Sequence, residues 1–218
     1  TVTMALGAGT VTPMQMATGY AVFANGGYRV NPWVISKVSE QRGKVLVESA
    51  PPVLADSERA IEPRNAFIMT SLLQEVTRSG TAARAQATLK RPDVYGKTGT
   101  TNDSMDAWFA GFQPTLAAVT WIGYDTPRKL GDRETGGGLS LPVWISFMES
   151  ALKGVPVAEL SAPEGVVYQG GEWYYDEFAK GSGVSSLGLG DKPEGEAPPT
   201  IPIPPAEEKK KILDLFSQ

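Results

Sequence analysis

Three segments of the chain carry apolar residues at helical spacing, each with proline near its start and glycine close to its end. They are residues 12–25, 62–79 and 141–153. Proline fits the first turn of a helix and glycine commonly ends one, so the pattern predicts three helices. Thr12 is a suitable N-cap for the first helix, and Thr81 for a further short helix over residues 81–89. In the 141–153 helix, the spacing predicts a set of inward-facing residues: Val143, Trp144, Phe147, Met148, Ala151 and Leu152.

Two other regions alternate with the period of a β-strand. Residues 34–49 alternate around a turn at Arg42 and Gly43, and residues 106–112 and 117–125 flank a second turn. Hairpins flanked by helices, without regular βαβ alternation, predict an α+β fold with an antiparallel sheet flanked by helices. The pattern fails from about residue 160, so we expect a domain over residues 1–158 and a largely disordered Pro/Gly-rich tail over residues 159–218.

Composition narrows the possible chemistry. The 218 residues include no cysteine and no histidine, which excludes a thiol nucleophile, a zinc–thiolate site and a Ser–His–Asp triad within this chain. An enzymatic base would have to be Lys, Asp, Glu or Tyr. A metal site built from carboxylates would need clustered Asp and Glu residues, and the sequence shows no such cluster. The net charge of −4 gives no basic surface for nucleic acid. No apolar run reaches the ~18–20 residues of a membrane span. Thr1 follows no initiator methionine, which indicates an excised fragment.

Residues 94–103, VYGKTGTTND, combine strand-like residues with a lysine, glycines and hydroxyls. As a strand at a sheet edge, this segment would place Thr98 and Thr100 on one side and Lys97 on the other. Lys97 would then have to reach around the edge or serve a residue beneath the strand, which the sequence does not name. Gly99 would let another backbone lie against the strand. An extended peptide pairing there would gain main-chain hydrogen bonds, and its carboxylate could bind the hydroxyls. A polar turn between strands is an equally open interpretation from this segment alone.

Gly96, Lys97 and Thr98 also match the end of a phosphate-binding loop. That motif needs glycine where this chain has Arg91, and it needs a helix that starts at the lysine. No long helical pattern follows, so the sequence disfavours phosphate binding.

Several segments, in this order, resemble the penicillin-binding proteins, the serine transpeptidases of bacterial cell-wall synthesis, and in particular their bifunctional class A type. They are LGAGTVTPMQMATGYAVFANGGYRVNP, SGTAARA, YGKTGTTNDSMDAWFAGF, WIGYD, and ETGGG with LPVWISFM. The resemblance covers roughly residues 4–155. It implies that residues 1–158 are the C-terminal portion of a transpeptidase domain with a serine β-lactamase-like fold.

The resemblance also implies roles for one strand. Lys97, Thr98 and Gly99 match the family's K-T-G signature, which here extends to Thr100. It implies that Lys97 supports a serine of the second signature and the substrate. It implies that the hydroxyls of Thr98 and Thr100 bind the terminal carboxylate of a peptide or a β-lactam. The amide of Thr100 would be one of two oxyanion donors.

The family's other signatures are missing from the chain. Its single Ser-x-x-K, Ser150 to Lys153, follows K-T-G and ends a predicted helix, so we interpret it as a chance match, and no Ser-x-Asn occurs. The resemblance therefore implies that the nucleophile and its base lie upstream, with a membrane anchor and a glycosyltransferase domain, on the periplasmic face of the inner membrane. The implied partners are a stem peptide ending in D-Ala–D-Ala, β-lactams and that upstream part. No cofactor, metal or nucleic acid is expected.

Two other functions stay open. The chain could be an inert fragment that acts as a packing or binding module, or part of a β-lactamase-like hydrolase.

Around the motif, Trp108 and Phe112 are predicted core residues, whereas Asp103 and Asp106 are predicted turn acids. The three glycines at 136–138 are expected to let a loop pass close to the strand at Lys97–Thr100, and a plain flexible connection stays open as the alternative.

Overall fold

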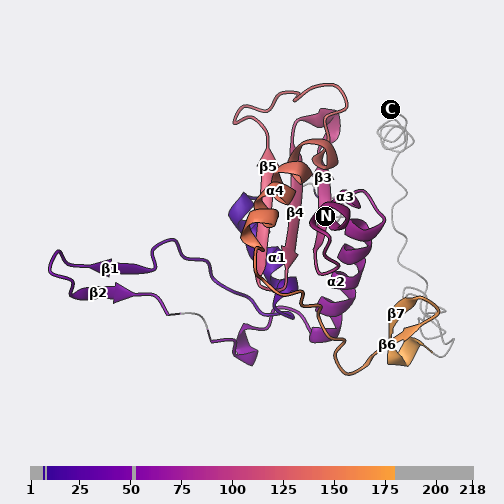
Figure 1. Ribbon diagram of the computed structural model, residues 1–218, viewed down its shortest axis with the longest axis horizontal. Helices are drawn as coiled ribbons and strands as arrows, with labels where there is room; N and C mark the ends of the chain where they lie inside the picture. The colour runs from indigo at the N-terminus through magenta and orange to yellow at the C-terminus, as the bar shows by residue number, and fades with distance from the viewer. Residues whose placement is uncertain (1–6, 8, 51–52, 180–218) are drawn as a thin grey trace, which may run out of the picture. The chain divides into compact units, whose positions relative to one another are not determined.

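A three-stranded antiparallel sheet forms the centre of the protein in the computed structural model, which describes residues 7, 9–50 and 53–179 (Figure 1). The strands are β3 (Tyr95–Thr100), β4 (Ala107–Gln113) and β5 (Leu116–Ile122), in the order β3-β4-β5. No described segment pairs with the outer edge of β3 or β5. The predicted α+β class with an antiparallel sheet is confirmed.

The predicted helices are present. They are α1 (Pro13–Ala24), α2 (Pro63–Arg78), α3 (Arg84–Leu89) and α4 (Leu141–Ala151), with short 3₁₀ turns at Asp56–Glu58, Asn102–Ser104 and Asp176–Phe178. Thr12 caps α1 as predicted, and Gln15 completes a capping box with it. Thr81 does not cap α3, because the N-cap of that helix is Ala83 and no side chain bonds to it. A π-helical glycine-rich turn (Gly136–Ser140) leads directly into α4.

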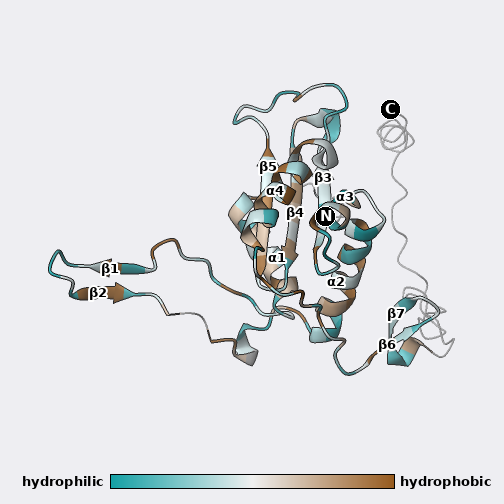
Figure 2. Ribbon diagram, in the orientation of Figure 1, coloured by the Kyte–Doolittle hydropathy of each residue, from teal (hydrophilic) through white to brown (hydrophobic). Residues whose placement is uncertain are grey.

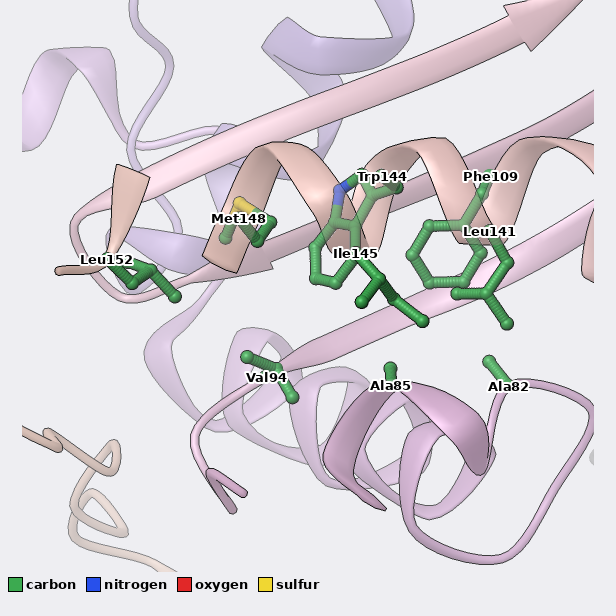
Figure 3. Packing of buried hydrophobic residues seen from close by; sticks show 9 residues of the cluster. All are labelled: Ala82, Ala85, Val94, Phe109, Leu141, Trp144, Ile145, Met148 and Leu152. Carbon is green, nitrogen blue, oxygen red and sulfur yellow. The ribbon is translucent and has the colours of Figure 1, made fainter. Parts of the chain in front are cut away.

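Helices cover both faces of the sheet. Phe109 of β4 packs edge-on against Trp144 of α4, with ring centroids 4.9 Å apart. Phe112 lies on the opposite face by strand alternation and packs against Tyr20 of α1. The larger cluster joins α4 to the α2–α3 region, as Figure 3 shows for Ala82, Ala85, Val94, Phe109, Leu141, Trp144, Ile145, Met148 and Leu152. Trp108 was predicted to be core like Phe112, but it is only partly buried.

The predicted inward face of α4 is partly wrong. Its buried residues are Leu141, Trp144, Ile145 and Met148, followed by Leu152 after the helix. Val143 and Phe147 are 52% and 50% exposed, and Ala151 is also exposed. The buried residues form one narrow stripe at helical spacing, and α4 carries more apolar residues than that stripe can bury.

The first predicted hairpin forms, but neither of its faces is covered. Strand β1 (Lys37–Ser39) pairs antiparallel with β2 (Val45–Glu48), with an irregularity between Val38 and Ser39. Every residue in both strands is exposed, although Figure 2 shows β2 as strongly hydrophobic. The alternation therefore predicted the strands correctly without predicting burial.

Regular structure also appears where the sequence predicts a tail. Strands β6 (Val166–Gln169) and β7 (Glu172–Tyr175) form a hairpin, and Trp173 packs edge-on against Phe67 of α2 at 4.8 Å. The prediction of a largely disordered segment from residue 159 is therefore wrong for this hairpin, because its aromatic side chains find partners on α2. Residues 180–218 lie outside the described residues, and the boundary at residue 158 stays a prediction.

Within the described part of the chain, no helix has the length and apolarity needed to cross a bilayer.

A buried carboxylate ties the sheet to the segment after α4. Asp93 is 0% exposed, and its two oxygens accept hydrogen bonds from Arg91 at 2.9 and 2.7 Å. Gln113 and the amide of Ala158 also donate to it, at 3.0 and 2.9 Å. Burial alone would raise the pKa of Asp93, but these hydrogen bonds and the positive charge of Arg91 outweigh it and hold the pKa below its usual value.

We predict that Asp93→Asn destabilises the chain by about 2–4 kcal/mol at pH 7, because breaking a buried, hydrogen-bonded ion pair leaves its partners unsatisfied. The lowered pKa means that the carboxylate stabilises the fold fully above its unfolded-state pKa of about 4, and that this contribution disappears as the pH falls through the folded-state pKa. The measurement is urea unfolding, followed by tryptophan fluorescence, over a pH series.

The matched control is Asp132→Asn, which breaks the exposed pair with Lys129 and should have little effect. If the stability difference between wild type and Asp93→Asn were the same at pH 7 and at pH 3, the assigned role of the Asp93 carboxylate would be wrong.

Candidate functional site

Strand β3 runs from the core to the surface. Tyr95 and Gly96 are buried, Thr98 and Gly99 are partly buried, and Lys97 and Thr100 are exposed. Residues 95–100 pair continuously with residues 107–112 of β4. The strand interpretation is thus confirmed. The polar-turn and phosphate-loop alternatives are wrong, because Lys97 sits in the middle of a strand and starts no helix.

The register fixes the side on which each side chain lies. Thr98 pairs with Phe109, whose ring packs on α4, so Thr98 and Thr100 lie on the α4 face. Lys97 starts on the other face, and its ammonium group Nζ reaches the Thr98 carbonyl oxygen at 2.9 Å and Thr98 Oγ1 at 3.4 Å. Lys97 therefore reaches around the edge, which is one of the two predicted alternatives, and it places a positive charge beside a hydroxyl.

Both threonine hydroxyls already have partners within the chain. Thr98 Oγ1 lies 2.9 Å from Thr81 Oγ1, and Thr100 Oγ1 accepts a hydrogen bond from the amide of Gly136 at 3.0 Å. The sequence did not place Thr81 near the site, and it predicted only that Gly136 would lie close to the strand. A hydroxyl that accepts from an amide keeps its own proton for another acceptor, so Thr100 can still donate to an anion.

Close backbone approach explains the glycine at position 136. A Cβ there would lie 2.3 Å from the Trp108 carbonyl oxygen and 2.5 Å from the Gly99 carbonyl oxygen. The prediction that the glycine-rich turn passes close to the Lys97–Thr100 strand is confirmed. A Cβ at Gly99 would lie 3.1 Å from Cβ of Trp108, so the missing side chain of Gly99 makes room for the Trp108 side chain.

The loop after β3 is held by local hydrogen bonds. Thr101 Oγ1 accepts from the Asp106 amide at 2.7 Å, and an Asp106 carboxylate oxygen accepts from Nε1 of Trp121 at 2.8 Å. Asp106 is therefore a structural residue of the loop. Asp103 and Ser104 adopt left-handed backbone angles, with φ of 59° and 52°. Asp103 is an exposed turn acid, as predicted.

Other candidates contribute nothing to this site. Ser150 of the chance Ser-x-x-K lies on the exposed side of α4, where it borders an open depression together with Phe147. Lys153 is exposed beyond the end of the helix. In the part of the chain that the structure describes, no group of three or more Asp or Glu residues could hold a metal ion.

Sequence reasoning missed Thr81 as a neighbour of the site and Asp93 as a buried anchor just before the start of β3. Thr81 belongs to the SGTAARA segment that carried part of the family resemblance, but its hydroxyl was assigned to a helix cap. Asp93 lies two residues before the start of β3, and its burial could not be inferred from a charged residue next to proline.

The fold and its edge strand match a known domain family. A family model described as the penicillin binding protein transpeptidase domain matches residues 1–148. Penicillin-binding protein 1A of Neisseria flavescens is 50% identical over 175 residues, which are 80% of this chain and 22% of that protein. The crystal structure of Penicillin-Binding Protein 1A from Haemophilus influenzae aligns with a TM-score of 0.74 and 32% identity, over 84% of this chain and 34% of that one.

A second solved structure is the PonA1 protein from Mycobacterium tuberculosis in complex with penicillin V. It aligns with a TM-score of 0.59 and 25% identity, over 75% of this chain and 43% of that one. The architecture is therefore that of the penicillin-binding transpeptidase fold. The chain belongs to the penicillin-binding protein transpeptidase family, and its similarity is to the class A type. It spans 22% of the length of the curated relative with 50% identity.

We predict that Gly136→Ala destabilises the chain by about 1–3 kcal/mol, because the added methyl group has to displace backbone atoms of both β3 and β4. The matched control is Gly138→Ala, whose Cβ would approach only Thr135 Oγ1, at 3.4 Å. Thermal unfolding measured by circular dichroism compares the two variants. Equal melting temperatures for the two variants would show that the contact at position 136 is not as close as described.

Proposed function

We propose that the intact parent of this chain is a D,D-transpeptidase that cross-links peptidoglycan through an acyl-serine intermediate and is inhibited by β-lactams. In this proposal the chain supplies the K-T-G-T strand, and an upstream part of the same protein supplies the serine nucleophile and its lysine base. The observation that carries the proposal is the arrangement on β3, where an ammonium group and two hydroxyls lie at a sheet edge that no described segment pairs with.

Each group on the strand fits one part of such a substrate. A peptide ending in D-Ala–D-Ala is extended and anionic at its terminus, so it can pair with a strand edge and place its carboxylate beside the ammonium group of Lys97. The hydroxyls of Thr98 and Thr100 then donate to that carboxylate. The amide of Thr100 serves as one oxyanion donor, and the amide of the upstream serine serves as the other.

The reaction runs in two acyl transfers. The upstream serine oxygen attacks the carbonyl carbon of the penultimate D-Ala and loses its proton to the lysine base. The C–N bond breaks, and the terminal D-Ala leaves as an amine that takes up that proton. The amine of a second stem peptide then attacks the ester carbonyl carbon, and the C–O bond to the serine breaks as the cross-linking amide bond forms. The proton that the amine loses goes to the serine oxygen. A β-lactam follows the first transfer through opening of its ring.

The remaining parts of the proposal concern the parent protein. We place it on the periplasmic face of the bacterial inner membrane, anchored by an upstream segment, with an upstream glycosyltransferase domain. No cofactor, metal or nucleic acid takes part. The penicillin V complex of PonA1 supports β-lactams as ligands of this class of site.

An alternative is favoured by one observation: the 218 residues contain no Ser-x-Asn, and no Ser-x-x-K precedes K-T-G. On this view the isolated chain is an inert packing or binding module. Acyl transfer by residues 1–218 alone would contradict it. A β-lactamase-like hydrolase is the third possibility, and the parent's rate of deacylation by water would distinguish it from a transpeptidase.

The direct test is labelling of the parent with a fluorescent penicillin. The proposal expects covalent labelling that disappears when the upstream serine is replaced by alanine. Labelling equal to that of the serine variant would remove the enzyme interpretation.

Within this chain, we predict that Lys97→Met lowers the rate constant for penicillin acylation of the parent on the order of a hundredfold. The variant removes an electrostatic contact to the carboxylate and to the neighbouring serine. Lys44→Met removes an exposed ammonium group near the β1–β2 turn and is the matched control, expected to acylate at the wild-type rate. Stopped-time labelling followed by gel fluorescence measures both variants. Equal rates for them would contradict the role of Lys97.

A further inference from the structure

Thr81 lies between α2 and α3 with an exposed side chain on a rigid backbone. The next residue, Ala82, is 0% exposed in the core, and its amide bonds to the Val76 carbonyl oxygen at 3.0 Å. Figure 3 shows Ala82 facing the α4 side chains. A Cβ at Gly80 would lie 2.9 Å from Cα of Val76, so the backbone on the other side is tightly packed too. The core therefore holds the Thr81 hydroxyl at a fixed place beside β3.

Hydrogen-bond capacity constrains the contact between Thr81 and Thr98. A hydroxyl has one proton to donate and two lone pairs that accept. The ammonium group of Lys97, 3.4 Å from Thr98 Oγ1, can only donate. In the 2.9 Å pair of hydroxyls, either oxygen can be the donor. If Thr98 donates to Thr81, its single proton is used within the chain. If Thr81 donates, Thr98 accepts from both neighbours and its proton is free for a ligand.

An anion at the strand selects the second arrangement. A carboxylate offers only acceptors, so Thr98 must turn its proton toward it, and Thr81 must then donate to Thr98. Such a chain of hydroxyls strengthens each bond by polarisation. Thr100 has the same arrangement already, because the amide of Gly136 fills one of its acceptor positions.

We propose that Thr81 is a positioning residue for the carboxylate of the substrate: its hydroxyl donates to Thr98 Oγ1 and so directs the Thr98 proton to the anion. This role rests on the proposed function, and the ligand is the terminal carboxylate of a peptide or the equivalent group of a β-lactam. Thr81 itself does not touch the reacting atoms. The glycine-rich turn lies close by, since a Cβ at Gly137 would be 3.4 Å from the Thr81 carbonyl oxygen.

The test compares two forms of one ligand on the full-length parent protein. Penicillin V has the free carboxylate, and its methyl ester lacks the charge. Thr81→Val keeps the shape of the side chain and removes the hydroxyl. We expect it to lower the ratio of acid to ester acylation rate constants about fivefold, because a hydrogen bond to a charged group is worth about 1 kcal/mol more than one to a neutral group, and that difference converts to roughly a fivefold change in rate constant. Thr81→Ser restores the hydroxyl and should restore the ratio.

The control is Thr18→Val, which removes a threonine hydroxyl that donates to the Met14 carbonyl oxygen within α1, and it should leave the ratio unchanged. If Thr81→Val slows the acid and the ester by the same factor, Thr81 is merely structural and the proposal is overturned. The same holds if serine fails to restore the ratio. If the wild-type parent reacts with neither compound, the proposed function fails and the role of Thr81 fails with it.

Discussion

The pairing of β3 with β4, on one edge only, is the constraint on which the site depends. It fixes alternate side chains on opposite faces of the sheet, so the threonines lie toward α4 while Lys97 starts on the far face. Because no described strand occupies the other edge, the lysine can wrap around it and bring its charge to the threonine side. A strand in the middle of a sheet would keep these groups apart.

The elements that sequence reasoning found correctly are those whose signals are local. Helices α1, α2 and α4 each combine helical periodicity with a proline at the start, and α1 carries a complete capping box. The errors arise where tertiary contacts decide. Phe147 and Trp144 both fit the apolar pattern of α4, but only Trp144 meets the sheet. The β6–β7 hairpin is ordered through contacts with α2, which lies far away in the sequence.

The candidate site also has a part that could be predicted from local sequence and a part that depends on tertiary contacts. The motif itself, Lys97 to Thr100, could be predicted, because strand alternation and the family signature both act over a few residues. The partners of its hydroxyls could not, since Thr81 precedes Thr98 by 17 positions and Gly136 follows Thr100 by 36. The glycines at 136–138 did predict a close approach, because residues without side chains let two backbones come together, although a flexible connection fitted the same run.

The glycine-rich turn runs directly into α4, and this continuity limits how far the turn can move when a ligand binds beside β3. Ser140 ends the turn with a hydrogen bond to the Ala107 carbonyl oxygen at 2.7 Å, and Leu141 and Trp144 immediately beyond it fill the core. An outward movement of this turn would pull Leu141 and Trp144, at the start of α4, out of the core. The glycine-rich turn is therefore poorly suited to open and close over the site. Under the proposed function, a peptide would therefore approach along the edge of β3 that no described segment pairs with, and the turn would form a fixed boundary beside it.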